Sequence, residues 1–187
     1  AAALAAPFYV LDEARGTGRV VVARGAGAEP TFVDIATLRG GSIEADLAVR
    51  DFTVNAMALD VAGALLDPHG GQRDLAERRL RLVAPQGIRD DPIRALRAVR
   101  QAAELGFSIE PATEAIISQD GAGLARISGE RVRDELVKLL LMPDAGGSFG
   151  RIERLGLLPA ALPEMAPTVD VTQSPPHRLS VWEHSLL

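Results

Sequence analysis

The sequence predicts an α+β fold, with a small sheet in the first part of the chain and helices in the rest. Three short runs before position 40 are rich in β-branched and aromatic residues, as strands usually are. They are residues 8–11, 19–22 and 31–35. From residue 91 onward, apolar residues recur at helical spacing. Because strands and helices fall in separate stretches, we expect a mixed or antiparallel sheet of about four or five strands, without alternating βαβ units.

Turns and shorter elements join these regions. Glycine-rich turns are predicted at residues 16–18 and 25–27, between the strand runs. Residues 44–59 suggest a helix, residues 65–71 a short strand that ends in a turn, and residues 79–83 one further strand.

The first helix of the second half is sharply delimited by its end signals. Asp91 suits the N-cap, Pro92 the first helical position and Gly106 the position just past the end. The apolar face of this helix is expected to contain Ile93, Leu96, Val99 and Ala103.

Three more helices are predicted before a proline-rich segment. One follows Pro111, one starts at Ser128 and stops before Pro143, and one occupies residues 147–156. Prolines make residues 158–176 largely irregular, so we expect a domain boundary there.

Composition indicates a globular protein and excludes several classes. The chain has 187 residues, 47% of them hydrophobic, which is enough for a substantial core. It has no cysteine, so disulfide frameworks and thiolate metal sites are excluded, and a reducing cytoplasm fits. No apolar run approaches the roughly 18 to 20 residues of a membrane span, and the start lacks the pattern of a signal peptide.

The charges are unevenly distributed. The net charge is −5, yet the 28 residues from Arg73 to Arg100 hold eight arginines and four acids, a local charge of +4. All basic residues except Lys138 are arginine, which favours planar recognition of phosphates and bases but also follows from a GC-rich genome.

Two clusters are candidates for nucleotide chemistry. Arg94, Arg97 and Arg100 step by three residues, so on a helix they lie within about 120° of one face, opposite the apolar one. They form either a cradle for phosphates and bases or a solvated face. Arg50-Asp51, followed by Asn55, is either a phosphate- and sugar-binding set or a local Asp51–Asn55 contact.

A metal centre is not predicted. Nucleotidyl transfer usually uses closely spaced acids to hold two metal ions, and no Asp-x-Asp occurs in the sequence. Glu44 and Asp46 have the right interval but lie at an expected helix start, and Asp34 stands alone in a strand run. The three histidines are scattered along the sequence. We therefore assign no catalytic residue and no metal ligand.

Four blocks follow one another along most of the chain. They are DLAVRDFTVNA at residues 46–56, LDPHGGQRDL at 66–75, DDPIRALRAVR at 90–100 and ISGERVRDEL at 127–136. In this order they resemble the class II tRNA nucleotidyltransferase (CCA-adding enzyme) and bacterial poly(A) polymerase family, within the DNA polymerase β-type superfamily. That family usually reads D-L-x-R-R-D-F-T-x-N-A, D-P-x-G-G-x-x-D-L, E-D-P-x-R-x-L-R-A-x-R and I-S-x-E-R-I-x-x-E-L.

The resemblance implies roles for particular residues. Asp91 and Arg94 are expected to act as a protein template that selects ATP or CTP by hydrogen bonds to the base edge. Arg50, Arg97 and Arg100 are expected to contact the nucleotide or its phosphates. Asp51 and Asn55 are expected to support the sugar and the arginines.

Departures from the family pattern limit which of the family's properties can be expected of this sequence. Asp90 stands where the family usually has Glu, and Val49 where it often has a second Arg. The family's Gly-Gly phosphate loop and Asp-x-Asp metal pair precede the matched region. We therefore expect a fragment that carries base selection and RNA binding but lacks the segment that holds the catalytic Mg²⁺ ions, and that is inactive alone.

The resemblance also implies a domain order. Residues 1–88 are expected to form the rear part of a nucleotidyltransferase head, and residues 89–160 a helical neck that binds nucleotide and RNA. Residues 161–187 are expected to be a linker and the start of a further helical domain. Residues 175–184 resemble the lead into an HD phosphohydrolase-type domain, in which His184 is a metal ligand only if that domain continues.

The expected function is template-independent addition of nucleotides, CCA or A, to the 3′ ends of tRNA or other RNA in the cytoplasm. The expected partners are the RNA 3′ end, ATP and CTP, with no membrane. An open sheet edge makes a homodimer a further hypothesis. The alternative function is a non-catalytic RNA-binding or assembly module.

Overall fold

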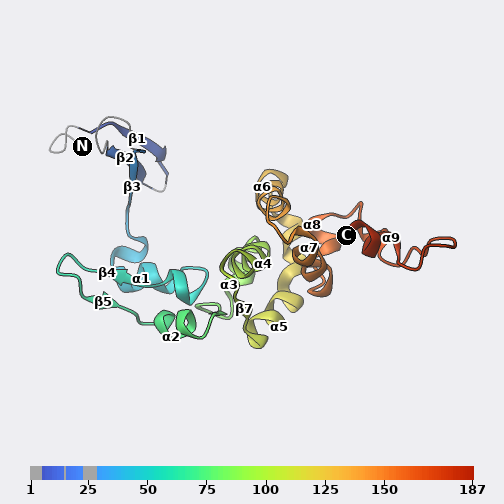
Figure 1. Ribbon diagram of the computed structural model, residues 1–187. Helices are drawn as coiled ribbons and strands as arrows, with labels where there is room; N and C mark the ends of the chain where they lie inside the picture. The colour runs from blue at the N-terminus through green and yellow to red at the C-terminus, as the bar shows by residue number, and fades with distance from the viewer. Residues whose placement is uncertain (1–5, 15, 23–28) are drawn as a thin grey trace. The chain divides into compact units, whose positions relative to one another are not determined.

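The computed structural model describes residues 6–14, 16–22 and 29–187 (Figure 1). The chain divides into two compact units, Ala1–Asp46 and Leu47–Leu187. The first contains a small sheet, and the second contains most of the helices. The architecture is α+β, as the sequence predicts. The described strands form one three-stranded and two two-stranded sheets, however, and not the single sheet of about four or five strands that we expected.

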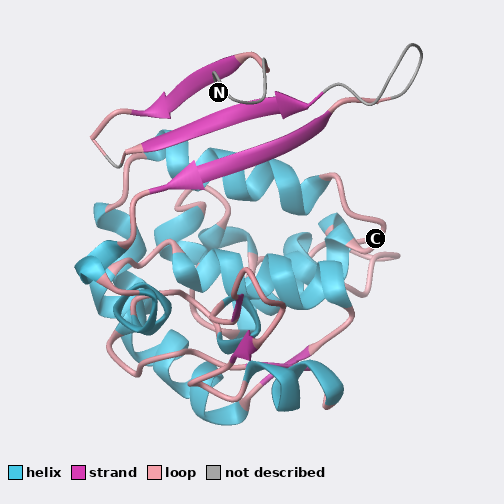
Figure 2. Cartoon of the chain, turned by 90° about the vertical axis from the view of Figure 1, so that its left-hand side faces the viewer, coloured by secondary structure: helices cyan, strands magenta, loops and turns pink. Residues whose placement is uncertain are grey.

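The first unit is built on a three-stranded antiparallel sheet (Figure 2). Its strands are β1 (Phe8–Asp12), β2 (Thr17–Val22) and β3 (Thr31–Ala36), with β2 in the middle. Val20 lies opposite both Phe8 and Val33 and is buried. These strands confirm the three predicted runs, and Gly16 turns the chain with a φ of 57°. The turn predicted at residues 25–27 lies outside the described residues.

The helix predicted at residues 44–59 is wrong beyond its first turns. After the short turn η2 (Arg39–Gly41), helix α1 spans only Ile43–Ala48, and η3 (Thr53–Asn55) and β4 (Ala58–Leu59) follow. Phe52 is extended, with φ −124° and ψ 151°, and pairs across an isolated bridge with Leu82. Burying this aromatic ring in the core requires the chain to leave the helix before residue 52.

The strand and turn predicted at residues 65–71 are confirmed, and a short helix follows them. β5 (Leu65–Leu66) pairs with β4, Gly70 adopts a φ of 75°, and α2 (Gly71–Ala76) leads to β6 (Arg79–Leu80). The Asp67 carboxylate accepts the backbone N–H groups of Gly71 and Gln72, at 2.7 and 3.0 Å. This contact satisfies the N–H groups at the start of α2 that have no partner within the helix.

Helices make up most of the remaining chain. They are α3 (Gly87–Asp90), α4 (Arg94–Leu105), α5 (Pro111–Asp120), α6 (Gly129–Leu140), α7 (Ala145–Arg154), α8 (Leu158–Ala161) and α9 (Val181–Ser185). The other elements are β7 (Ser108–Ile109), which pairs with β6 in parallel, and the 3₁₀ turns η4 (Gly121–Arg126) and η5 (Ala166–Thr168). The helices predicted after Pro111 and Ser128 are confirmed. The one predicted from residue 147 begins earlier because Asp144 caps it.

Helix α4 differs from its prediction at the start and on one face. The Asp91 carbonyl accepts the N–H of Arg94 at 3.0 Å, but the Asp91 side chain does not cap the helix. At the other end Gly106 has a φ of 65° and closes the helix as predicted. Ile93, Leu96 and Val99 are buried, whereas Ala103 is exposed and Ala102 is buried in its place. The apolar face of α4 passes through Ala102 and not Ala103 because a helix has 3.6 residues per turn, so a face cannot follow one fixed spacing.

The core of the second unit forms where α4 packs against α6 and α7 (Figure 1). Its fully buried side chains include Leu96, Val99, Leu139 and Ile152. Residues 158–176 are largely irregular, as predicted, and contain only the short elements α8 and η5. No helix among the described residues is both long and apolar enough to cross a membrane.

Candidate functional site

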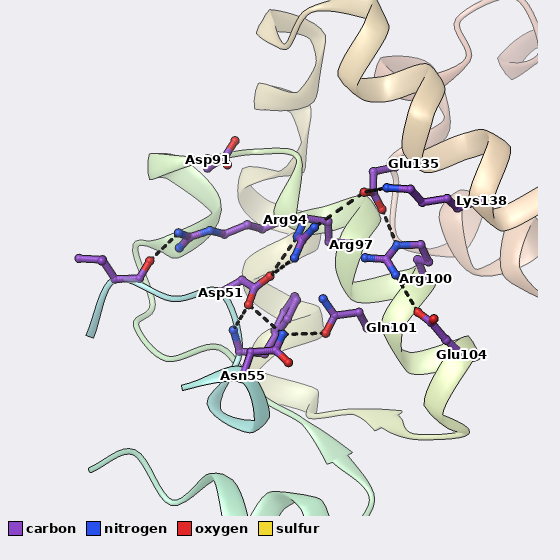
Figure 3. Close-up of polar contacts among 12 residues, drawn as sticks. Asp51, Asn55, Asp91, Arg94, Arg97, Arg100, Gln101, Glu104, Glu135 and Lys138 are labelled. Atoms are coloured by element: carbon purple, nitrogen blue, oxygen red, sulfur yellow. Dashed lines mark hydrogen bonds and ion pairs between the residues drawn. The ribbon is translucent and has the colours of Figure 1, made fainter. Parts of the chain in front are cut away.

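All seven residues of the predicted site belong to the second unit. They are Arg50, Asp51, Asn55, Asp91, Arg94, Arg97 and Arg100. The first three lie in the segment after α1, and the others lie at the start of α4 or along it. Figure 3 shows that Asp51, Asn55 and Arg97 meet although two different segments supply them. The predicted face of three arginines is confirmed, because each is more exposed than the buried residues on either side of it.

Asp51 is the central acceptor of this group. Its Oδ2 accepts hydrogen bonds from Arg97 Nε and Nη2, at 3.0 and 2.7 Å. Its Oδ1 accepts from the Phe52 N–H at 2.9 Å and from Asn55 Nδ2 at 3.0 Å. Burial by itself would raise the pKa of Asp51, but hydrogen bonds from Asn55, Arg97 and Phe52 outweigh it and hold this pKa below its usual value. Asp51 is therefore an anion at neutral pH.

Asn55 joins this carboxylate to α4. Its amide nitrogen donates both to Asp51 and to Gln101 Oε1, the latter at 2.9 Å. Gln101 is buried, and sequence reasoning missed it because it lies 46 residues from Asn55. The local contact expected between Asp51 and Asn55 is present, but it spans a 3₁₀ turn and not a helix.

The guanidinium of Arg94 is anchored by a backbone carbonyl. Its Nη2 donates to the Val49 carbonyl at 2.8 Å. Val49 is one of the positions where this sequence departs from the family pattern, but a carbonyl acceptor does not depend on side-chain identity. Gly87 leaves room for the guanidinium, because a Cβ there would lie 3.1 Å from Arg94 Nη1.

The Asp91 side chain is held by an arginine of α6. Its Oδ2 accepts from Arg131 Nη2 at 2.9 Å, and the two side chains are 33% and 48% exposed. Asp91 follows the end of α3 and Arg94 begins α4. They are thus an acceptor and a donor close to the start of α4, and one side-chain atom of each is bonded to another segment. Arg131 was not predicted as a partner of Asp91, although it lies in the sequence block at residues 127–136.

Arg100 is less exposed than Arg97, at 13% against 34% of the side chain. Its Nε donates to Glu135 Oε2 at 2.6 Å and its Nη1 to Glu104 at 2.7 Å. Lys138 also donates to Glu135, at 3.0 Å. Arg50, the last predicted residue, lies exposed beside Asp51, and its backbone N–H bonds to the Leu47 carbonyl.

Two of the acids considered for a metal centre, Asp34 and Asp46, have arginine partners. Asp34 receives a two-point contact from Arg19 on the adjacent strand, at 2.6 and 2.8 Å. Asp46 is buried and accepts from Arg39 at 2.9 Å. In the part of the chain that the structure describes, no three His, Asp or Glu side chains gather closely enough to hold a metal ion.

Two protein-family models match the chain. "Poly A polymerase head domain" matches residues 14–81, and "Probable RNA and SrmB- binding site of polymerase A" matches residues 106–168. Asp51 and Asn55 fall in the first match, Arg131 and Glu135 fall in the second, and α4 lies between the two. The contacts described above therefore link the two matched segments.

Curated relatives cover the chain but are longer. The A-adding tRNA nucleotidyltransferase of Deinococcus radiodurans is 42% identical over 100% of this chain and 42% of its own length. The CC-adding tRNA nucleotidyltransferase of Geobacter sulfurreducens is 47% identical over 78% of this chain and 33% of its own length. The chain therefore spans less than half the length of these relatives.

Solved structures share the fold. The CCA-adding enzyme of Bacillus stearothermophilus in complex with CTP is 36% identical, with a TM-score of 0.71 over 81% of this chain and 39% of that one. The Thermotoga maritima CCA-adding enzyme complexed with tRNA is 32% identical, with a TM-score of 0.75 over 93% of this chain and 41% of that one.

Proposed function

Because the chain belongs to the class II tRNA nucleotidyltransferase and bacterial poly(A) polymerase family, we propose that it selects the incoming nucleotide and binds RNA during template-independent addition of C or A to tRNA 3′ ends. The observation that carries this proposal is the pair at the start of α4. Asp91 and Arg94 are each held by one atom, to Arg131 and to the Val49 carbonyl, and remain partly exposed.

The chemistry of this pair matches two of the four bases. Cytosine and adenine each present an exocyclic amine donor beside a ring-nitrogen acceptor, whereas guanine and uracil present a carbonyl beside a ring N–H. A carboxylate only accepts hydrogen bonds and a guanidinium only donates them. Asp91 therefore accepts from the amine, and Arg94 donates to the ring nitrogen. A fixed acceptor and donor favour C and A over G and U without a nucleic-acid template.

The other predicted residues support this recognition. We assign Arg50 to the phosphates, because a guanidinium forks onto phosphate oxygens. Arg97 and Arg100 are oriented by Asp51 and Glu135, and their remaining N–H groups are proposed to contact the nucleotide. Asp51 and Asn55 hold Arg97 and Gln101 in place and are proposed to reach the sugar.

The domain order stays a proposal. Residues 1–88 correspond to the rear of the head, 89–160 to the neck, and 161–187 to a linker and the start of another helical domain. Mg²⁺ is proposed as the ion that accompanies ATP or CTP, since it neutralises charge on transferring phosphates. The described residues gather no acidic site for it, so no step is derived through the ion.

The proposed partners are the tRNA 3′ end and a second copy of this chain. RNA binding is supported by exposed arginines on α6, such as Arg131 and Arg133. We place the activity in the cytoplasm because tRNA is matured there. Self-association is supported by β1 and β3, which lie at the edges of the described sheet and expose Tyr9 and Phe32. A monomeric sedimentation profile at every concentration would contradict self-association.

Equilibrium binding of labelled ATP and CTP to this chain tests the proposed function. Wild-type protein is expected to bind both, and Arg94→Ala to lose about tenfold or more in affinity, as expected for one charge-assisted hydrogen bond. Arg73→Ala is the control, because the Arg73 side chain is exposed and pairs only locally with Glu77, four residues further on. Unchanged binding by Arg94→Ala contradicts the proposal.

A non-catalytic RNA-binding or assembly module gives a different result. Contacts to phosphate alone weaken steeply with salt and do not distinguish bases. Binding of RNA with that salt dependence, together with equal affinity for all four nucleotides, would favour this second function.

A further inference from the structure

A buried carboxylate from α6 lies behind the arginine face of α4. Glu135 is only 5% exposed. Its Oε2 accepts from Arg100 Nε at 2.6 Å, and its Oε1 accepts from Lys138 Nζ at 3.0 Å. Arg97 Nη1 lies 3.8 Å from Oε1, within ion-pair distance. Figure 3 shows these three cations converging on Glu135. One side chain thus touches two of the three arginines that face the nucleotide site.

The position of Glu135 is unusual for a charged residue. It lies on the buried side of α6 between Val132, Leu136 and Leu139. Burial by itself would raise the pKa of Glu135, but hydrogen bonds from Arg100 and Lys138 outweigh it and hold this pKa below its usual value. The group is therefore an anion inside a core. Buried ion pairs are often no better for stability than apolar residues of the same volume, so stability alone does not account for this arrangement.

Arg97 lies between two carboxylates that come from different parts of the chain. Asp51 holds its Nε and Nη2, and Glu135 faces its Nη1. A planar guanidinium contacted at two edges has one orientation instead of several, because rotation breaks one of the contacts. Asp51 precedes α4 and Glu135 follows it, so the direction of Arg97 depends on both flanking segments.

The charges of the cluster balance. The acids Asp51, Glu104 and Glu135 and the bases Arg97, Arg100 and Lys138 sum to zero. Neutralising Glu135 leaves one net positive charge and weakens the contact that fixes Arg100 Nε. Guanidinium groups that are held less firmly are attracted to any phosphate near them, whatever base it carries.

We propose that Glu135 is a positioning residue of the nucleotide site, which holds Arg97 and Arg100 in the orientation required for base-selective binding and keeps them from acting as non-selective phosphate binders. The inference rests on the proposed function, because it names a residue that shapes the same site. Glu135 does not contact the nucleotide and acts through the two arginines.

The test compares Glu135→Gln with Glu130→Gln. Both variants neutralise a glutamate on α6, but Glu130 is exposed in its first turn. The probes are ATP, CTP, GTP and UTP, together with inorganic tripolyphosphate, which has no base. Glu135→Gln is expected to lower the preference for ATP and CTP over GTP and UTP by roughly fivefold or more, a typical coupling between linked sites. Tripolyphosphate is expected to bind as well as before or better. Glu130→Gln is expected to change neither.

A second readout follows the arginines directly. In the wild type, the Nε–H protons of Arg97 and Arg100 are bonded to carboxylates and should exchange slowly with water in nitrogen-proton NMR spectra. In Glu135→Gln the Arg100 signal is expected to exchange faster. Glu135→Asp keeps the charge but shortens the side chain, and it should lose part of the base preference even if Glu135→Gln fails to fold.

The outcomes separate the two proposals. If the wild-type chain shows no nucleotide binding, the proposed function fails and this inference fails with it. If the wild type prefers ATP and CTP and all Glu135 variants that fold keep that preference, the role of Glu135 is overturned while the proposed function stands. Equal losses for tripolyphosphate and the four nucleotides also overturn it, because they indicate a purely structural role.

Discussion

Arg97 donates two hydrogen bonds to one oxygen of Asp51, with Nε and Nη2 at 3.0 and 2.7 Å. The two residues are 46 positions apart. This contact ties the segment after α1 to the middle of α4. Asn55 completes the tie by donating to both Asp51 and Gln101. The proposed nucleotide site therefore depends on how two chain segments dock, and its residues also contribute to stability.

Replacing Asp51 by Asn should destabilise the second unit. Asparagine is neutral, so Arg97 loses the anion that its Nε and Nη2 contact, and we expect a loss of about 1–3 kcal/mol in the free energy of unfolding. Urea denaturation followed by circular dichroism measures it. Asp134→Asn is the control, since its exposed pair with Arg133 should contribute less than about 1 kcal/mol. Equal effects of the two variants would refute this prediction.

Asp74 should matter more for stability than any exposed acid. It is fully buried and accepts from Thr53 Oγ1 at 2.7 Å and from Arg79 and Arg81 at 2.7 and 2.8 Å. Asp74→Asn removes the buried anion that the half-buried Arg79 and Arg81 share, which should cost about 3 kcal/mol. The same denaturation measurement checks it, with exposed Glu77→Gln as the control. A loss below that of Glu77→Gln would show that Asp74 does not organise this turn.

Two glycines should respond to alanine in opposite ways. A Cβ at Gly71 would lie 2.3 Å from the Thr53 carbonyl and 2.8 Å from the Met57 side chain, so Gly71→Ala should destabilise by about 1–3 kcal/mol. Gly129 begins α6 with nothing within 4 Å of that position, so Gly129→Ala should be neutral or stabilise by up to about 1 kcal/mol. Thermal denaturation of both variants gives the comparison, and a stable Gly71→Ala protein would contradict the packing.

Acid should destabilise the protein through Asp51 and Glu135. The pKa values of both are lowered in the folded state, so their contribution is fully present above the unfolded-state pKa values of about 3.9 and 4.3. It is lost as the pH falls through the lowered folded-state values. Urea midpoints between pH 7 and pH 3 should therefore fall below about pH 4. In Glu135→Gln the urea midpoint should fall less steeply as the pH is lowered. The same dependence of the midpoint on pH in this variant and the wild type would count against the pairing of Glu135.

Local patterns predicted the elements whose ends are set by their own residues. The three strand runs, the helix that follows Pro111 and the end of α4 at Gly106 are examples. The end of α1 was missed because a distant contact, the bridge between Phe52 and Leu82, decides it. Helix α2 was missed because its six residues give little periodic signal and its start depends on Asp67.

The site shows the same division. The blocks of sequence predicted Asp51, Asn55, Asp91 and the arginines of α4 as candidate site residues, and the contact between Asp51 and Asn55 is local. Their partners Gln101, Arg131 and Glu135 are supplied from 46, 40 and 35 positions away. The spacing of residues within one segment cannot reveal pairs between distant segments. One signal was present, however: Glu135 falls on the apolar face of α6, and a buried glutamate needs a cationic partner.

The most direct test of base selection is competition among the four nucleotides for the wild-type chain and for Arg94→Ala. A labelled CTP analogue at fixed concentration is displaced by ATP, CTP, GTP or UTP. The wild type is expected to bind ATP and CTP at least about tenfold more tightly than GTP and UTP, and Arg94→Ala to lose that difference. Equal displacement by all four nucleotides in the wild type would contradict selection of the base by Asp91 and Arg94.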